Sequence, residues 1–456
     1  MNPATPLRTD AFERRAPQTL ELDDIQGGVL QQLPVPYVGT FVLLRIDDKR
    51  TGREFLKRLL PVLRNVAAPI SAESDAWVSV ALTFQGLRAL GLPESSLESF
   101  SPEFREGMAE RASILQDVGE SAPQSWEAPF SSADVHVAVT AMAPDQTRLD
   151  ALLQRATAAH SELPNITPIY RLDCKSSDGH EAFGYHDNIS QPTIEGSGIA
   201  GSNPKEEPIR AGEFILGYLD ESEHIAPVPT PEALGKNGSY LVIRKLQQRV
   251  AEFRRYLRSA AAGSEEEELL AAKIMGRWRS GAPLVLAPDR DDPALGADPS
   301  RNNDFAFGAE DDGRGFKCPL GSHVRRMNPR DAEIFGNPRR HRLIRREASY
   351  GPRLPEDALQ DDGQDRGMIF ACICASIKGQ FEFIQEEWMN SGVFIGQKDE
   401  RDPLCGANDG SGTFTIPERP IRRRLQGLPR FVVTRGGAYF FMPGLRAIRW
   451  IADLNT

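Results

Sequence analysis

Apolar residues in the first part of the chain fall into short runs separated by polar segments. The runs that predict β-strands cover residues 37–46, 77–84, 134–142 and 166–174. Residues 51–63 and 147–160 instead carry apolar positions at helical spacing, and Pro61 should kink or end the first of these helices. The resulting order β-α-β-β-α-β is the ferredoxin-like arrangement.

The second half of the chain repeats this order more loosely. Strands are expected at residues 239–246, 368–376 and 430–441. One expected helix places four apolar side chains on one face, Leu246, Val250, Phe253 and Leu257. Another helix is expected at residues 379–390. A segment rich in Gly, Pro, Asp and Arg, residues 277–366, separates the two parts of this half. A long irregular insertion in a compact domain is usually functional.

These patterns predict an α+β protein with two ferredoxin-like domains and antiparallel sheets. We place a polar, proline-bearing arm at residues 1–24, one domain at 25–215 and the other at 216–456. A chain of 456 residues is too long for one typical core, which agrees with a two-domain division.

Composition narrows the class of protein. A hydrophobic content of 40% and a charged content of 26% are typical of a soluble globular chain. The net charge of -10 argues against a nucleic-acid partner. No apolar run is long enough to span a bilayer, and the N-terminus has no secretory h-region, so we expect no membrane partner. Five cysteines, an odd number, then favour reduced thiols and a cytoplasmic location.

His323 stands out among the seven histidines because a dense run of arginines follows it. The run comprises Arg325, Arg326, Arg330, Arg339, Arg340, Arg342, Arg345 and Arg346. A solvated face or a nucleic-acid patch would also contain such a run, but the chain is acidic and the run lacks interleaved aromatic residues. One imidazole for iron, with guanidinium groups for two propionates, is what a haem pocket requires.

A second stretch, "AFGYHDNISQPTIEG" at residues 182–196, brings an acid and an imidazole together in a loop. Gly184 allows close backbone approach, and Pro192 ends the loop. Asp187 would be a turn or cap residue in most sequences. Beside a haem ligand, however, it becomes a candidate general acid–base.

Several separated motifs resemble the dye-decolorizing peroxidases, a family of haem peroxidases. They are "IQGGVL", "GYHDNISQP", "NNDFAFG", "CPLGSHVRRMNPR", "RRHRLIRREASYG", "GMIFACICASIKGQFEFIQEEW" and "RGGAYFFMPGL". They occur in the family's order and span the chain from about Ile25 to its end. The resemblance implies two ferredoxin-like domains, of which the first carries the distal Asp motif and the second carries the proximal His and the distal Arg.

The resemblance also implies a function and a set of site residues. It implies one haem b per chain, with His323 as the iron ligand and Arg330 at a propionate. Asp187 would be the catalytic acid–base, and Arg345, rather than its neighbour Arg346, the charge-stabilising arginine. The implied activity is reduction of hydrogen peroxide with one-electron oxidation of organic substrates such as dyes and phenolic compounds. Whether the chain forms a homo-oligomer stays open.

The sequence departs from the family's distal motif at one position. Asn188 replaces the second glycine, and Asn tolerates left-handed backbone better than other non-glycine residues, so the turn is expected to survive. We include Gly184, His186 and Asn188 with His323 and Arg330 as cofactor-binding candidates.

Other assignments rest on weaker patterns. Glu382 and Glu386 are candidates for the acid that accepts the second N–H of His323. Trp388 and Tyr350 are candidates for surface residues that relay electrons from bulky substrates, but ordinary packing is the favoured role for each.

Two other functions compete with the peroxidase. One is a non-catalytic haem sensor or carrier in which the Cys318–Pro319 thiolate binds iron. The other is a metal hydrolase that uses His180, His186 and Asp187, although their spacing is irregular for metal ligands.

Overall fold

The computed structural model describes residues 16, 18–67, 75–308, 311–332, 334 and 336–454. The arm predicted for residues 1–24 lies largely outside this part of the chain. Among the described residues, no helix combines the length and the apolar character needed to cross a bilayer.

The first half forms the predicted ferredoxin-like unit. Its strands are β1 (Tyr37–Ile46), β2 (Trp77–Leu82), β3 (Val137–Ala143) and β4 (Ile166–Ser176). They lie in the order β4-β1-β3-β2 and are antiparallel. The helices α2 (Lys49–Leu59) and α6 (Gln146–Ala158) connect them, and Pro61 lies just beyond α2 in the short η1 (Leu60–Val62), as its restricted backbone predicts.

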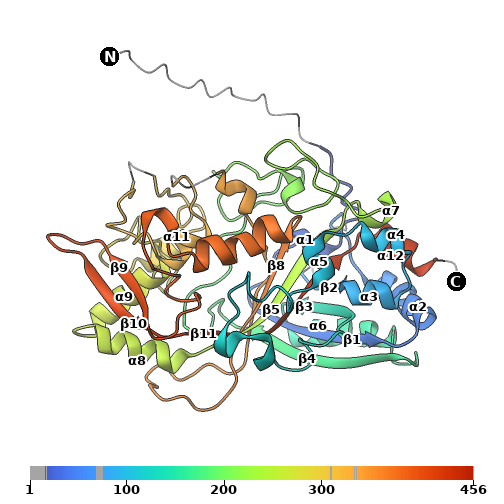
Figure 1. The fold of residues 1–456 in the computed structure, drawn as a ribbon, viewed down its shortest axis with the longest axis horizontal. Coiled ribbons are helices and arrows are strands. Elements are labelled where there is room, and N and C mark those ends of the chain that lie inside the picture. The colour runs from blue at the N-terminus through green and yellow to red at the C-terminus, as the bar shows by residue number, and fades with distance from the viewer. Residues whose placement is uncertain are drawn as a thin grey trace.

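The second half repeats this order. Its strands are β5 (Ser239–Gln248), β6 (Ile344–Arg345), β7 (Ala348–Tyr350), β8 (Gly367–Cys374) and β11 (Val432–Met442). The order β11-β5-β8-β6 matches that of the first unit, with β7 also paired to β8. A single pairing, Phe441 with Leu82, joins β11 to β2, so both units share one nine-stranded sheet (Figure 1). The expected α+β class with antiparallel ferredoxin-like units is therefore confirmed.

Local signals explain why α2 forms where it does. Asp48 caps its N-terminus by accepting the N–H of Thr51 at 2.9 Å. Phe55, Leu56 and Leu59 recur at helical spacing and are fully buried. Burial of each such side chain stabilises the fold by about 1.5–3 kcal/mol.

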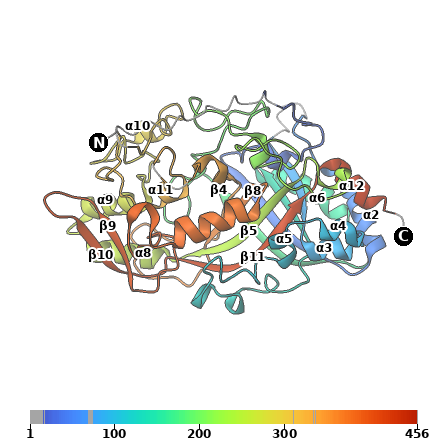
Figure 2. The same ribbon diagram turned by 45° about the horizontal axis from the view of Figure 1, so that its top comes forward.

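Two expectations for the second half need correction. Leu246 belongs to β5, where it pairs with Met368 and Thr434, so α8 (Val250–Ala260) begins after it. The helix expected at residues 379–390 is π-helical, as η6 (Ile377–Glu382) and η7 (Ile384–Asn390). Figures 1 and 2 show this orange helical segment crossing one face of β5, β8 and β11. Π-helical turns are frequent at functional sites.

Most remaining elements are short. They are α1 (Gly27–Leu30), α3 (Phe84–Ala89), α4 (Glu94–Glu98), α5 (Pro102–Glu106), η2 (Gly119–Ser121), η3 (Pro123–Ser125), η4 (Ala211–Glu213), α7 (Glu232–Gly235), α9 (Ser264–Met275), α10 (Pro293–Gly296), α11 (His323–Met327), η5 (Pro338–His341), η8 (Phe394–Gly396), β9 (Gly412–Ile416), β10 (Arg423–Leu428) and α12 (Leu445–Ala452). The insertion predicted at residues 277–366 is indeed mostly irregular and contributes α10, α11, β6 and β7. It supplies much of the site described next.

Candidate active site

A cavity of about 270 Å³ lies between the loop at residues 181–190, α11, η7 and the sheet of the second half. Six residues that the sequence predicted for the site line it, namely His186, Asp187, Asn188, His323, Arg330 and Arg345. Gly184 is not among its lining residues. The fold therefore brings the two sequence stretches around Asp187 and His323 to one place.

His323 begins α11 and is held by an acid. Its Nδ1 lies 2.9 Å from Oδ2 of Asp402, which is fully buried. The other oxygen, Oδ1, accepts the backbone N–H groups of Leu404 and Cys405 at 2.9 and 2.8 Å. Burial alone would lower the pKa of His323, but the facing Asp402 carboxylate outweighs it and raises that pKa well above its ordinary value. With Nδ1 engaged, Nε2 is the ring nitrogen that can bind a metal.

The acids expected beside His323 have other positions. Glu382 is buried, but it accepts Nη2 of Arg111 at 2.6 Å and the hydroxyl of Tyr439 at 2.9 Å. Glu386 is exposed. The assignment of either as the His323 partner was wrong, because Asp402 occupies that position from an irregular segment before β9.

A buried carboxylate shapes the loop that carries Asp187. Glu181 accepts the backbone N–H groups of Phe183 and Tyr185 at 3.0 and 2.9 Å. Between them Gly184 has φ +95°, and a Cβ there would lie 3.0 Å from Arg279 Nη1. Gly184 thus makes the turn rather than lining the cavity.

The turn also survives the replacement of glycine at position 188. Asn188 adopts φ +60°, as expected for the non-glycine residue that best tolerates this conformation. Its backbone N–H donates to Asp187 Oδ1 at 2.7 Å, and its side-chain oxygen accepts Gln191 Nε2 at 2.6 Å. These bonds fix the Asp187 carboxyl relative to the loop.

Arg345 and an acid missed by the sequence reasoning lie next to Asp187. Arg345 Nη1 is 3.1 Å from Oε1 of Glu347, which is 3% exposed. Burial alone would lower the pKa of Arg345, but the carboxyls of Glu347 and Asp187 raise it. Burial raises the pKa of Glu347 to about 8. Its signal in the sequence was only its place two residues after Arg345.

Arg346 points elsewhere, which separates it from Arg345. Its guanidinium donates to the carbonyl oxygens of Gly28 and Val29 at 3.1 and 2.9 Å. It therefore ties β6 to α1, within the "IQGGVL" stretch, while Arg345 faces the cavity.

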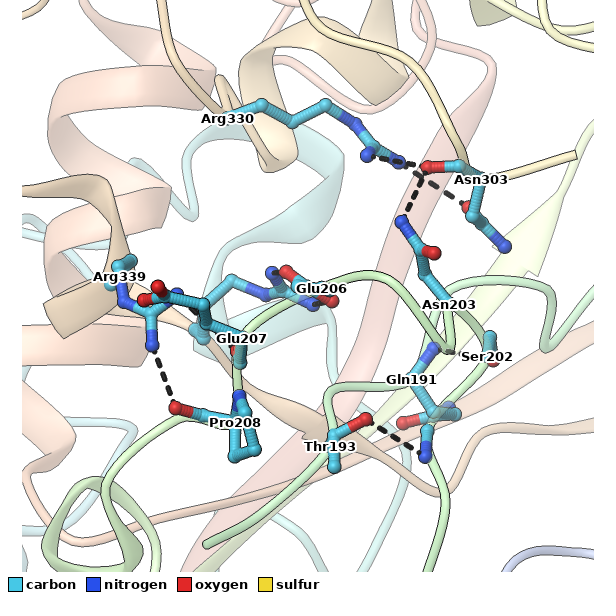
Figure 3. Close-up of polar contacts among 12 residues, drawn as sticks. Gln191, Thr193, Ser202, Asn203, Glu206, Glu207, Pro208, Asn303, Arg330 and Arg339 are labelled. Carbon is cyan, nitrogen blue, oxygen red and sulfur yellow. Dashed lines mark hydrogen bonds and ion pairs between the residues drawn. The ribbon is translucent and has the colours of Figure 1, made fainter. Parts of the chain in front are cut away.

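Two arginines form a cationic wall of the cavity. Arg330 donates to the carbonyl oxygen of Asn303 at 2.9 Å (Figure 3). It also donates to the carbonyl oxygen of Phe305 at 3.1 Å. Arg277 donates to the side-chain oxygen of Asn303 at 2.6 Å. Burial lowers the pKa of Arg277 to about 9 and that of Arg330 to about 10. Within the described residues, neither forms an ion pair with a carboxylate, and Arg330 Nε has no partner.

Arginines that line a cavity without forming an ion pair fit an anionic ligand. The sequence reasoning found Arg330 through its motif. It missed Arg277, which stands at the start of the insertion without a motif of its own.

The structure does not support the ligand sets of the competing functions. Cys318 is fully buried in a separate apolar cluster and does not line the cavity, so it is not placed to bind a ligand there. Its burial raises the pKa of the thiol to about 11. The His180 and His186 rings lie 5.2 Å apart, but among the described residues the cluster with metal-ligand proximity is His323, Asp402 and Cys405.

The two residues expected to relay electrons at the surface are buried. Trp388 is 4% exposed and packs edge-on against His341 and Phe383. Tyr350 is 3% exposed, lies under Lys245 and approaches Asp365 with its hydroxyl at 3.2 Å. Neither is a surface residue, and ordinary packing, the role favoured for both from the sequence, accounts for them.

Comparison with known proteins identifies the same family from each half of the chain. Residues 24–176 match the DyP dimeric alpha+beta barrel domain, and residues 220–419 match the C-terminal domain of Dyp-type peroxidases. A dye-decolorizing peroxidase from Mycena epipterygia is 32% identical over 99% of this chain and 90% of its own length.

Solved structures agree. A dye-decolorizing peroxidase in complex with 2,6-dimethoxyphenol superposes with a TM-score of 0.81 at 27% identity, covering 95% of this chain and 100% of that one. Another, described with an engineered haem pocket, has a TM-score of 0.80 at 27% identity with the same coverage. The chain therefore belongs to the dye-decolorizing peroxidase family and is a peroxidase.

Proposed function

We propose that the cavity holds one haem b, bound to His323 through Nε2, and that the protein uses it to reduce hydrogen peroxide while oxidising organic substrates such as dyes and phenolic compounds. The observation that carries this proposal is the pairing of His323 with a buried Asp402 in the cavity that also holds Arg277 and Arg330. The 2,6-dimethoxyphenol bound by a relative supports the phenolic substrate class.

The donor set fits a haem. An imidazole whose other nitrogen is held by a carboxylate is a strong iron ligand with a fixed tautomer. Arg277 and Arg330 are cations without carboxylate partners among the described residues, and propionates would supply the missing negative charge. When bound, the haem supplies the iron and the electron-transfer chemistry that the protein itself lacks.

The protein's own residues move the proton and stabilise charge. The Asp187 carboxylate takes a proton from one oxygen of hydrogen peroxide and returns it to the other as water leaves. A positioned acid–base of this kind contributes about 10²–10⁴ in rate. Arg345 stabilises the negative charge that develops as the O–O bond breaks, a contribution of about 10²–10³.

We also propose that the protein works in a reducing cytoplasm. All five cysteines are unbridged, and four of them are buried. Burial raises the pKa of the thiols of Cys174, Cys372, Cys374 and Cys405, so they stay protonated.

Substitution of the two reacting residues tests the proposal. Asp187→Asn and Arg345→Leu should keep the visible absorption spectrum of the bound haem and strongly slow the reaction with hydrogen peroxide in stopped-flow mixing. Arg346→Leu is not a suitable control because Arg346 anchors α1, so the exposed Glu386→Gln serves instead. Unchanged peroxide reactivity in both site variants would overturn the assignment.

A further inference from the structure

Glu347 is a buried acid for which the proposed mechanism has no use. It lies between β6 and β7 and is 3% exposed. Neither of its carboxyl oxygens has a well-directed hydrogen bond within the described residues, although Arg345 Nη1 lies 3.1 Å from Oε1. A buried carboxyl without hydrogen bonds is costly, so its presence in the cavity needs an explanation.

The charges around Glu347 come from several elements. Arg345 and Arg346 lie on the same chain segment as Glu347. Asp187 approaches from the loop at residues 181–190, and Cys372 approaches from β8. Burial and the neighbouring Asp187 raise the pKa of Glu347 to about 8, although Arg345 opposes the shift. Near neutral pH and below, Glu347 therefore carries its proton and has an O–H to donate.

The side chain of Asp187 is the acceptor within reach of that O–H. Two carboxyls at one site favour a state in which one is ionised and the other protonated. The Asn188 N–H already donates to Asp187 Oδ1, which leaves Oδ2 for a second donor. A donor aimed at a carboxylate fixes its orientation, and a fixed carboxylate is better placed to accept a proton from peroxide.

We propose that Glu347 is a positioning residue that donates a hydrogen bond from its carboxyl O–H to the Asp187 carboxylate and orients that carboxylate for peroxide. The proposal rests on the proposed function of Asp187. No proton is consumed: Asp187 accepts one proton from peroxide and returns it to the leaving water, while Glu347 keeps its own. As pH rises through about 8, Glu347 ionises, loses the O–H and repels Asp187.

Two substitutions separate this role from a simple ion pair with Arg345. Glu347→Gln keeps a donor without a charge, whereas Glu347→Leu removes the donor. We expect Glu347→Gln to react with peroxide as fast as the wild type below pH 8 and to lose the decline above it. Glu347→Leu should be about tenfold slower and should also lose the decline above pH 8. If Glu347 were an ionised partner of Arg345, Glu347→Gln would be as slow as Glu347→Leu.

Infrared spectroscopy supplies a readout that does not depend on turnover. The wild type should show a protonated-carboxyl band of Glu347 that titrates near pH 8 and disappears in Glu347→Gln, while the band of Glu213, which titrates in the same range, remains. Glu213→Gln is the matched control: Glu213 is also buried with a pKa raised to about 8, but it lies outside the cavity, so its loss should leave the pH profile of peroxide reduction unchanged.

The outcomes distinguish the two proposals. If no variant, nor the wild type, binds haem, the proposed function fails, while the infrared band still tests the protonation of Glu347. If haem binds and peroxide reacts, but Glu347→Gln is slow and no band disappears, the role of Glu347 is overturned. The Glu347→Gln arm decides the question even if Glu347→Leu does not fold.

Discussion

Asp402 holds the imidazole of His323 through an Oδ2–Nδ1 contact of 2.9 Å, although 79 residues separate the two in the chain. Asp402 is itself fixed because its second oxygen accepts two backbone N–H groups, those of Leu404 and Cys405. One carboxylate thus orients the ring and makes its free nitrogen a better ligand.

The first prediction removes the charge of Asp402. In Asp402→Asn the side-chain amide must either turn its NH₂ toward His323, which loses that contact, or present it to the two backbone donors, which loses both backbone hydrogen bonds. We expect haem affinity to fall by about 10–100-fold, measured by titration of the haem-free protein with haem and followed by absorbance. Glu386→Gln, at an exposed position of η7, is the control. Equal affinity in Asp402→Asn and wild type would contradict the role of Asp402.

Local pattern was enough for the sheet and for the central site residues. The strands of both units were predictable because β-branched and apolar runs stand between polar turns, as in residues 37–46. Asp187, His323 and Arg345 were predictable because each stands inside a motif. The left-handed backbone of Asn188 was predictable from residue preference alone, and its φ of +60° agrees.

Long-range contacts were not predictable in this way. Asp402 lies in an irregular segment with no periodicity, so the candidates were the helical Glu382 and Glu386, of which Glu382 pairs with Arg111 instead. Trp388 has the same sequence signal whether it is packed or exposed, and only the tertiary fold buries it. Leu246 fits the helical spacing of the next helix, but pairing with β8 and β11 keeps it in the strand.

The second prediction tests the anion for which Arg330 is placed. Arg330→Met should weaken haem binding by about 10–100-fold, the equivalent of one hydrogen bond to a charged group. The wild type should show a similar loss for haem whose propionates are esterified, because that ligand lacks the carboxylates. Arg330→Met should then bind haem and its ester more nearly alike, which titration of each protein with each ligand measures.

Arg339→Met is the matched control for Arg330. It comes from the same arginine run, but it pairs with Glu221 at 2.9 Å and does not line the cavity. It should therefore retain the wild-type preference for haem over the ester. A preference that persists in Arg330→Met would mean that Arg330 does not contact a propionate.

The third prediction concerns the glycine pair of α1. A Cβ on Gly28 would lie 2.3 Å from Ser79 Oγ and 3.0 Å from the Trp77 ring, both on buried β2. Gly28→Ala should lower the free energy of unfolding by about 1–3 kcal/mol, as overpacking does, in urea denaturation. Gly263→Ala, whose Cβ would meet nothing within 4 Å and whose φ of 174° is extended, should be close to neutral. Equal stability of the two variants would mean that α1 shifts to make room.

The fourth prediction follows from Glu213, a buried acid outside the cavity. Burial raises its pKa from 4.5 to about 8, and Asp220 and Glu221 add to the rise. The folded protein therefore binds a proton that the unfolded chain releases above pH 4.5, so this stabilisation is complete below that pH and is lost by about pH 8. In this window the free energy of unfolding should fall with pH by at most about 1.4 kcal/mol per pH unit because of Glu213, and Glu213→Gln should remove this fall. Denaturant midpoints measured from pH 5 to pH 8 should fall more steeply in wild type than in Glu213→Gln.

The contribution of Glu347 cancels because both proteins contain it. Glu232→Gln, at a side chain that is 81% exposed, is the control and should follow the wild type. Parallel curves for wild type and Glu213→Gln would show that Glu213 titrates alike in the folded and unfolded chains, despite its burial beside Asp220 and Glu221.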